Sequence, residues 1–299
     1  MDKIEILPVA LLEENRSLVN ELKALASTLG LEFGWHYLLD LTWIISALGD
    51  VNGKKIMDAG AGTGVLQWYL AQKGATVFSV DRASRADLPW RFRRWTEVRG
   101  WRPVDLNPSR VALWNVLRAP GSLKKRLSAA LAMVKGGFRK RPPQGDGKAS
   151  VAGRVWIYNQ DLRHLSDIPD NSLDAVAALS ALEHNPPDQL PQVVAELLRV
   201  IKPGGLLLAT LGASREQDWF HQPSQGWCYS EMTLRRAFDL PQAVPSNYAR
   251  YDQLFEQLRN CTELKENLAR FYFRSGDNGM PWGVWDPQYQ SVGVVKVKR

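Results

Sequence analysis

The stretch from Asp58 to Gly64 constrains this 299-residue chain more than any other part of its sequence. It reads Asp-Ala-Gly-Ala-Gly-Thr-Gly between a short apolar run and the helically spaced run 65–70. This order predicts a strand, a tight turn and a helix. Because Gly60, Gly62 and Gly64 carry no Cβ, a ligand can lie against bare backbone while the helix presents its unpaired N–H groups. The stretch therefore predicts a nucleotide-binding loop.

An acidic residue at the end of the next apolar run strengthens this prediction. Asp81 follows the run 75–80, seventeen residues after Gly64. A carboxylate at the carboxyl end of a strand can accept hydrogen bonds from both hydroxyls of a ribose. A glycine pattern alone is a weak signal, whereas the pattern with its strand, helix and distal acid is much stronger.

Asp58 separates two classes of cofactor. Dinucleotide folds carry G-x-G-x-x-G beside a pyrophosphate, which an acid would repel, but here the pattern is D-x-G-x-G-x-G. S-adenosylmethionine has no phosphate and carries a sulfonium and an α-ammonium, which a carboxylate attracts. With these residues the sequence resembles the class I S-adenosylmethionine-dependent methyltransferases of the small-molecule type, similar to those of quinone biosynthesis. The resemblance implies S-adenosyl-L-methionine as cofactor and a doubly wound, mostly parallel α/β sheet of seven strands.

A second segment carries the same resemblance. Asp161 and Leu162 follow the strand-like run 155–158. In the resembled family the acid at this place takes the exocyclic amine of adenine and the next apolar residue touches the ring, so the resemblance implies these roles for Asp161 and Leu162. The alternative is that Asp161 only forms a turn.

A helix, a turn and a strand complete the resemblance. Apolar residues from Leu190 to Ile201 fall at offsets 0, 3, 4, 7, 8 and 11, which predicts a helix with one buried face. Lys202-Pro203-Gly204-Gly205 is expected to end it before a buried strand at 206–211. The matching motifs cover about residues 54–81 and 155–212.

The segment Ser180-Ala181-Leu182-Glu183-His184 ends the predicted fourth strand. We place Ser180 among the cofactor-binding residues and take His184 as the candidate catalytic residue, because a histidine can act as a base on a hydroxyl acceptor near neutral pH. Members of the family with unlike substrates often show a similar Leu-Glu-His here, so a structural role for His184 stays equally open.

The remaining chain is divided by its spacing and charge. Residues 1–52 predict N-terminal cap helices, 53–81 and 155–299 the methyltransferase domain, and 82–154 a basic, Trp-rich insertion. In the last third we expect helices at 229–238 and about 251–273 and a final antiparallel strand at 291–297. The aromatic-rich loop at 280–286 is either part of an acceptor pocket or simply a well-packed loop.

The positive charge of the chain is concentrated in the insertion. The chain carries a formal net charge of +7, whereas residues 82–154 hold 18 Lys and Arg against four acids. Leu123, Leu127 and Leu131 lie on one helical stripe that Ala130 and Val134 extend. Four tryptophans stand near arginines, namely Trp90, Trp95, Trp101 and Trp114.

Three interpretations of the insertion are open. It can be a lid whose apolar stripe packs on the domain, a membrane-surface element in which residues 109–141 contact anionic lipid, or an RNA-binding element. Asn185-Pro186-Pro187-Asp188 superficially resembles the Asn-Pro-Pro-Tyr tetrad of enzymes that methylate nucleic-acid bases. Asp188 lacks the aromatic face that would stack on a base, which disfavours nucleic acid as the substrate.

The cysteine spacing and the apolar stretches of the sequence indicate the cellular compartment and whether a metal is bound. Cys228 and Cys261 stand 33 positions apart, which fits neither a metal-ligand pair nor a disulfide framework, and we expect no metal. The first residues lack a signal-peptide pattern, and the apolar-leaning stretch 37–48 is too short to span a bilayer. We expect a cytoplasmic protein, with peripheral attachment at the inner membrane face as the alternative.

The preferred hypothesis is O-methylation of a small or lipid-linked acceptor, a glycan or an isoprenoid, at the cytoplasmic face of the membrane. An RNA methyltransferase that uses the basic insertion is one alternative. A catalytically silent protein that only binds the cofactor is the other.

Overall fold

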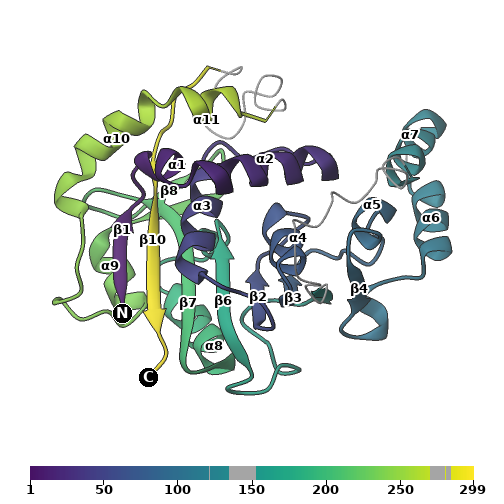
Figure 1. Ribbon diagram of the computed structural model, residues 1–299, viewed down its shortest axis with the longest axis horizontal. Helices are drawn as coiled ribbons and strands as arrows, with labels where there is room; N and C mark the ends of the chain where they lie inside the picture. The colour runs from purple at the N-terminus through teal and green to yellow at the C-terminus, as the bar shows by residue number, and fades with distance from the viewer. Residues whose placement is uncertain (121, 135–152, 270–279, 281–283) are drawn as a thin grey trace.

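A computed structural model describes residues 1–120, 122–134, 153–269, 280 and 284–299, and its centre is one twisted, mostly parallel sheet (Figure 1). The main path of the sheet runs β1-β10-β7-β6-β2-β3-β5-β4, and β9 and β8 branch from β7. The strands are β1 (Lys3–Ile6), β2 (Lys55–Ala59), β3 (Thr76–Asp81), β4 (Glu97–Gly100), β5 (Arg154–Asn159), β6 (Leu173–Leu179), β7 (Ile201–Ala213), β8 (Trp219–His221), β9 (Gly226–Tyr229) and β10 (Gln290–Val297).

Helices cover both faces of this sheet, which makes an α/β/α sandwich. The helices are α1 (Ala10–Glu14), α2 (Arg16–Leu29), α3 (Tyr37–Leu48), α4 (Val65–Gln72), α5 (Trp90–Arg93), α6 (Ser109–Arg118), α7 (Leu123–Val134), α8 (Leu190–Val200), α9 (Glu231–Ala237), α10 (Tyr251–Arg259) and α11 (Thr262–Glu266), with short 3-10 turns η1 (Pro103–Asp105), η2 (Leu182–His184) and η3 (Tyr248–Arg250). The predicted α/β class with a mostly parallel sheet is confirmed.

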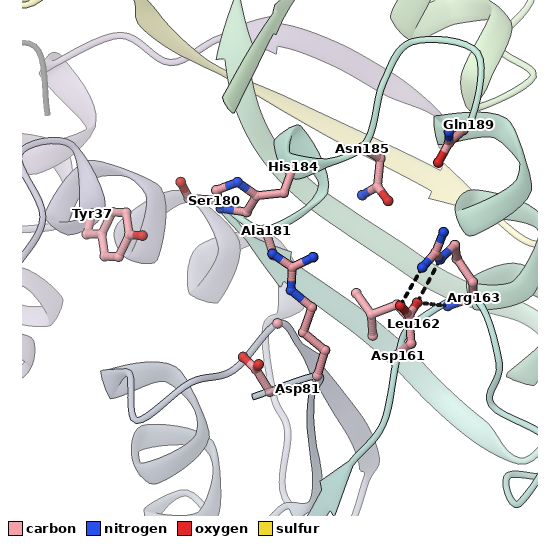
Figure 2. Close-up of a pocket in the computed structure, with 12 residues that line it drawn as sticks. Tyr37, Asp81, Asp161, Leu162, Arg163, Ser180, Ala181, His184, Asn185 and Gln189 are labelled. Atoms are coloured by element: carbon pink, nitrogen blue, oxygen red, sulfur yellow. Dashed lines mark hydrogen bonds and ion pairs between the residues drawn. The ribbon is translucent and has the colours of Figure 1, made fainter. Parts of the chain in front are cut away.

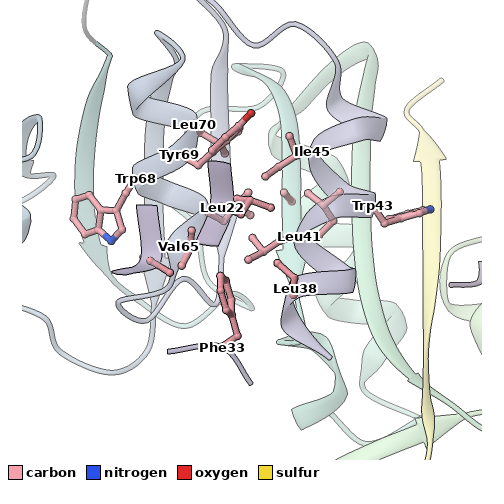
Figure 3. Close-up of a cluster of buried hydrophobic side chains, with 14 of the residues drawn as sticks. Leu22, Phe33, Leu38, Leu41, Trp43, Ile45, Val65, Trp68, Tyr69 and Leu70 are labelled. Atoms are coloured by element: carbon pink, nitrogen blue, oxygen red, sulfur yellow. The ribbon is translucent and has the colours of Figure 1, made fainter. Parts of the chain in front are cut away.

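Two hydrophobic clusters hold the layers together. Along β7, Leu208 packs on the face that α2, α3 and α4 cover, whereas Leu207 and Ala209 pack on the face that α8 and α9 cover. This alternation follows from the two-residue period of a strand. Figure 3 shows Leu41 of α3 and Val65 of α4 among the side chains of the first cluster. Both faces are therefore buried, which explains the apolar runs in the central strands.

The predicted count of seven strands differs from the described sheet, which has ten. The N-terminal region was expected to be helical, but Lys3–Ile6 forms β1, which pairs antiparallel with β10 at the sheet edge. The insertion contributes β4, which pairs in parallel with β5. Short edge strands with little apolar pattern of their own depend on a partner strand, and this dependence hides them from a periodicity argument.

Two other predicted boundaries change. The Lys202–Gly205 segment, expected as a turn between the helix and the next strand, lies inside the strand: α8 ends at Val200, β7 begins at Ile201, and Gly204 adopts a φ of 79° where the pairing with β6 shifts register. The single helix expected at about 251–273 is two helices, α10 and α11, and residues 270–273 lie outside the described residues.

The C-terminal strand and the helix α9 agree with prediction. β10 is antiparallel to β7, as the family resemblance implied. Ser230 caps α9 by accepting a hydrogen bond from the backbone N–H of Thr233. Within the described ranges, no helix is long and apolar enough to cross a bilayer.

The start of the insertion packs into the domain. Trp95 is buried, Trp101 makes edge contacts with Phe78 and Trp156, and Trp114 stays 54% exposed. Helices α6 and α7, the teal pair beyond β4 in Figure 1, lie at one end of the molecule. Residues 135–152, which include the predicted membrane-contact positions 135–141, lie outside the described residues.

Candidate active site

The glycine loop joins the end of β2 to the first turn of α4. Gly60 and Gly62 adopt left-handed backbone angles, with φ of 77° and 47°. A Cβ built on Gly60 would lie 2.3 Å from the Cβ of Ala181, a distance that real side chains do not reach. The loop therefore needs glycine at Gly60 for two reasons, its backbone conformation and its close approach to Ala181.

Asp81, at the carboxyl end of β3, is tied to this loop. Its Oδ2 accepts a hydrogen bond of 2.8 Å from the backbone N–H of Gly62, and its Oδ1 accepts one of 2.7 Å from Ala83. Carboxylate oxygens can accept further bonds, so Asp81 keeps acceptor capacity for a ligand. The parallel pairing of β2 and β3 brings the two segments together.

A cavity of about 490 Å³ opens at the carboxyl edge of the sheet (Figure 2). Its lining includes the predicted residues Gly60, Asp81, Asp161, Leu162, Ser180 and His184. These positions come from four separate segments, and the parallel order of β6, β2, β3 and β5 places their strand ends at one edge. This edge is where open α/β sheets bind ligands.

Asp161 is also bound by a neighbour, as the dashed lines in Figure 2 show. The Arg163 guanidinium donates to both carboxylate oxygens, at 3.0 and 2.8 Å, and the Arg163 backbone N–H donates at 2.9 Å. These hydrogen bonds lower the pKa of Asp161 to about 2. Asp161 is therefore an ionised acceptor with a fixed orientation beside Leu162.

An adjoining cavity of about 260 Å³ contains the other predicted residues. Asp58, Gly62 and Gly64 line it, together with the aromatic side chains of Phe33 and Tyr37. Gly60, Ser180 and Tyr37 line both cavities. The two cavities together hold every residue that the sequence analysis assigned to the cofactor.

Asp58 is buried, and its environment changes its acidity. Burial raises the pKa of Asp58 to about 7, an effect that the positive charge of Arg85 opposes. An ionised Asp58 would be stabilised by a cationic group placed in the cavity that it lines.

Gln67 holds the glycine loop through side-chain hydrogen bonds, and the sequence analysis did not predict this role. Its side-chain amide nitrogen lies 3.2–3.3 Å from the carbonyl oxygens of Ala61, Gly62 and Gly64, and its amide oxygen accepts a 2.7 Å bond from Ser79. The side chain is fully buried. Gln67 thus satisfies carbonyl groups of a turn that has no regular partners of its own.

Arg85 completes this support, although it belongs to the predicted insertion. Its guanidinium donates to the carbonyl oxygens of Gly62, Ser79 and Tyr158, and to the Ser79 hydroxyl. The residue is 6% exposed, and burial lowers its pKa. Arg85 places a positive charge between the glycine loop and the neighbouring strands, so the insertion begins with a residue that organises the cofactor loop.

His184 lies at the mouth of the site. It is exposed, and its Nδ1 is 2.9 Å from the carbonyl oxygen of Gln225. It lines the 490 Å³ cavity and a third, smaller one, which also contains His36. The catalytic role of His184 stays a prediction.

Comparisons with known proteins find methyltransferases among the proteins similar to this chain. The family described as "Methyltransferase domain" matches residues 139–209. A curated relative, the ubiquinone biosynthesis O-methyltransferase of Leptothrix cholodnii, is 42% identical over 48 residues, which are 16% of this chain and 20% of the relative. The match thus spans about one fifth of that relative's length.

Solved structures are similar over most of the chain at low sequence identity. Phosphoethanolamine N-methyltransferase 2 of Haemonchus contortus, solved with phosphomonomethylethanolamine and S-adenosylhomocysteine, is 14% identical over 96% of this chain and 60% of that one, with a TM-score of 0.47. The cyclase SpnF is 17% identical over 100% of this chain and 99% of that one, with a TM-score of 0.46. The glycine motif, the mostly parallel sheet and the methyltransferase-domain match over residues 139–209 together support a class I S-adenosylmethionine-dependent methyltransferase.

Proposed function

We propose that the protein transfers the methyl group of S-adenosylmethionine to an oxygen atom of a small or lipid-linked acceptor. The observation that carries the proposal is the pair of adjoining cavities that share Gly60, Tyr37 and Ser180. One cavity presents Asp81 for a ribose and Asp161 for an adenine. The other presents the glycine loop and Asp58 for the cationic methionine end.

Charge supports this cofactor over a dinucleotide. Glu32 and Asp58 line the smaller cavity, and none of its described lining residues is basic, so it would repel a pyrophosphate and attract a sulfonium and an ammonium. The methyl carbon of the cofactor is already activated for displacement, so the protein mainly has to hold two reactants in line.

The acceptor is proposed from a weaker set of observations. The curated relative is named as an O-methyltransferase of ubiquinone biosynthesis, which supports oxygen as the acceptor atom and an isoprenoid among the acceptor classes. A glycan acceptor is the other class retained from the sequence.

Methyl transfer can be tested without knowing the acceptor. Purified protein is incubated with methyl-labelled S-adenosylmethionine and solvent extracts rich in glycolipids or isoprenoids, and label is measured in the extract. We expect transfer to at least one extract. Cofactor binding without transfer to any extract or to RNA would contradict the proposal and favour a silent binding protein.

We propose in addition that α6 and α7 attach the protein to an anionic bilayer. Leu123, Leu127 and Leu131 are 66, 49 and 62% exposed, and the indole of Trp114 is exposed on the adjacent helix. Only Ala130 of the predicted stripe is described as buried. A lid packed on the domain would bury the three leucines, so their exposure supports the membrane interpretation.

The charge of the same pair of helices fits lipid headgroups. The sequence 109–134 holds five basic residues, Arg110, Arg118, Lys124, Lys125 and Arg126, and no acid. Apolar side chains with flanking cations suit the boundary between headgroups and acyl chains. RNA would use the cations but leave the leucines in water, so a bilayer is the better partner.

A further inference from the structure

A small cavity of about 110 Å³ adjoins both proposed cofactor cavities at Tyr37 and Ser180. Its walls include the buried aromatic rings of Trp35 and Tyr289, whose centroids lie 5.1 Å apart, and the ionisable side chains of His36 and Glu183. A methyl donor in the cofactor cavities would border this chamber. Its position therefore suits the group that receives the methyl.

His36 is held in this chamber by a buried carboxylate. Its Nδ1 lies 2.7 Å from Oδ2 of Asp40, one helical turn further along α3. The same Asp40 oxygen accepts a 3.0 Å hydrogen bond from the Thr210 hydroxyl of β7. Asp40 is fully buried and His36 is 5% exposed. Because Nδ1 is occupied by Asp40, Nε2 is the ring nitrogen left for a ligand.

Glu183 brings a buried carboxyl into the wall of the chamber. One oxygen accepts a hydrogen bond from the Ser180 hydroxyl, while Oε2 is buried and has no hydrogen-bond partner among the described residues. Burial raises the pKa of Glu183. An unpartnered carboxyl oxygen inside a cavity is costly unless a ligand satisfies it.

Backbone strain marks the same place. Ser180, which like Tyr37 lines all three cavities, adopts a left-handed φ of 46° directly after β6. Such a conformation is strained in a residue other than glycine, and it persists where the surrounding structure enforces it. Here it directs the Ser180 hydroxyl toward Glu183.

We infer that His36, oriented by Asp40, is the catalytic base of methyl transfer and accepts a proton from a hydroxyl of the acceptor. The inference rests on the proposed function. The acceptor oxygen forms a bond to the methyl carbon, the carbon–sulfur bond breaks, and its electron pair remains on sulfur as a neutral thioether. The hydroxyl proton moves to Nε2 of His36 and is later released to water.

The charges around the chamber also define the acceptor class. His36, the residue before α3, faces Asp40 from the first turn of that helix, Glu183 and His184 from η2, and the Tyr289 ring from the segment before β10. An anion in the chamber would lie beside the Glu183 carboxyl, with the Asp40 carboxylate behind His36, and no lysine or arginine among the described residues lines the chamber to stabilise it. The group that enters the chamber is therefore a neutral or cationic hydroxyl compound, with a hydrogen-bond donor for the free oxygen of Glu183.

Chemical labelling tests whether His36 is open to a ligand. Diethyl pyrocarbonate acylates neutral imidazole nitrogens, and mass spectrometry of peptides resolves the histidines of this chain. In the folded protein we expect His36 to react within about tenfold of the rate of exposed His164. Asp40→Asn should lower the pH midpoint of His36 labelling, because the carboxylate raises the pKa of His36. Labelling of His164 without His36 would overturn the inference.

Kinetics separate a base from a structural histidine. His36→Gln keeps a donor for Asp40 and should lower label transfer to the extract about 100-fold or more, with cofactor affinity within about twofold of wild type. His164→Gln is the matched control. Transfer that survives His36→Gln contradicts this inference alone, whereas a wild-type protein that transfers nothing contradicts the proposed function.

Discussion

Asp58 is the residue whose protonation should control cofactor binding. Its pKa is raised to about 7, so the free protein holds a proton there below neutral pH. If the ionised form attracts the cationic end of the cofactor, affinity should fall about tenfold between pH 8 and pH 6. Calorimetric titration with S-adenosylmethionine across this range measures the effect.

A matched substitution identifies Asp58 as the titrating group. Asp58→Asn has a similar shape but cannot ionise, so it should bind more weakly at pH 8 and lose most of the pH dependence. The raised pKa also means that the free energy of unfolding falls as the pH rises from about 4 to 7. Over this range the unfolded chain releases the Asp58 proton that the folded state retains. If the affinity of Asp58→Asn for S-adenosylmethionine changed with pH as much as that of wild type, this assignment would be contradicted.

Gly60 and Gly53 form a natural pair for testing the glycine loop. Both have positive φ, 77° and 72°, but a Cβ at Gly60 meets Ala181 whereas one at Gly53 meets nothing within 4 Å. Gly53→Ala should therefore cost only the left-handed strain, about 1–2 kcal/mol. Gly60→Ala should cost at least about 1 kcal/mol more, because it adds a steric clash. Urea unfolding compares the two, and equal losses would exclude the close approach.

Local spacing predicted some site residues and could not predict others. Gly60, Asp81 and Asp161 lie at or just beyond the ends of strands, so a local motif predicts them. Gln67 acts through contacts that only the tertiary fold creates, and its sequence neighbourhood looks like an ordinary helix. The i, i+4 spacing of His36 and Asp40 can be read from the sequence, but it does not by itself distinguish a catalytic histidine from a packed cap residue.

At the scale of elements, long periodic segments were predicted well. The helix from Leu190 and the strand at 291–297 have strong apolar patterns, and both formed as expected. The edge strands β1 and β4 could not be predicted from sequence, because their stability comes from pairing with β10 and β5 rather than from an apolar pattern of their own.

Helix α7 is the element on which the membrane proposal depends. Leu127→Glu should abolish binding to vesicles that contain phosphatidylglycerol, because it removes an apolar side chain from the bilayer contact and adds a negative charge that the anionic lipid repels. Each basic residue near the membrane surface contributes about 1 kcal/mol to the attraction. Met232→Glu is the control, since Met232 is an exposed apolar residue on α9. Cosedimentation at low salt measures binding.

The two variants also test the competing interpretations of α7. Leu127 is half exposed, so Leu127→Glu should leave the unfolding curve and cofactor affinity unchanged. Unfolding of this variant would favour a packed lid. Wild-type protein that ignores anionic vesicles but binds RNA in a salt-sensitive manner would favour the nucleic-acid alternative.

At the scale of the whole molecule, the parallel sheet makes one site from distant sequence. Asp58, Asp81, Asp161 and Ser180 span more than 120 positions, yet each lies at or just beyond the carboxyl end of a strand. The strand order β6-β2-β3-β5 makes these strands neighbours. The motifs predicted this convergence because they imply a fold. The motifs could not predict that Arg85, near the start of the insertion, hydrogen-bonds to the glycine loop.

The measurement that tests the central claim most directly is calorimetric titration of wild type and Asp81→Ala with S-adenosylmethionine. Wild type should bind one equivalent, and Asp81→Ala should bind about tenfold to hundredfold more weakly, since loss of a charged hydrogen-bond acceptor costs about 1.5–3 kcal/mol. Glu14→Ala, which removes an exposed acid from α1, should bind like wild type. Wild-type protein that does not bind the cofactor, or a folded Asp81→Ala variant with unchanged affinity, would contradict the account.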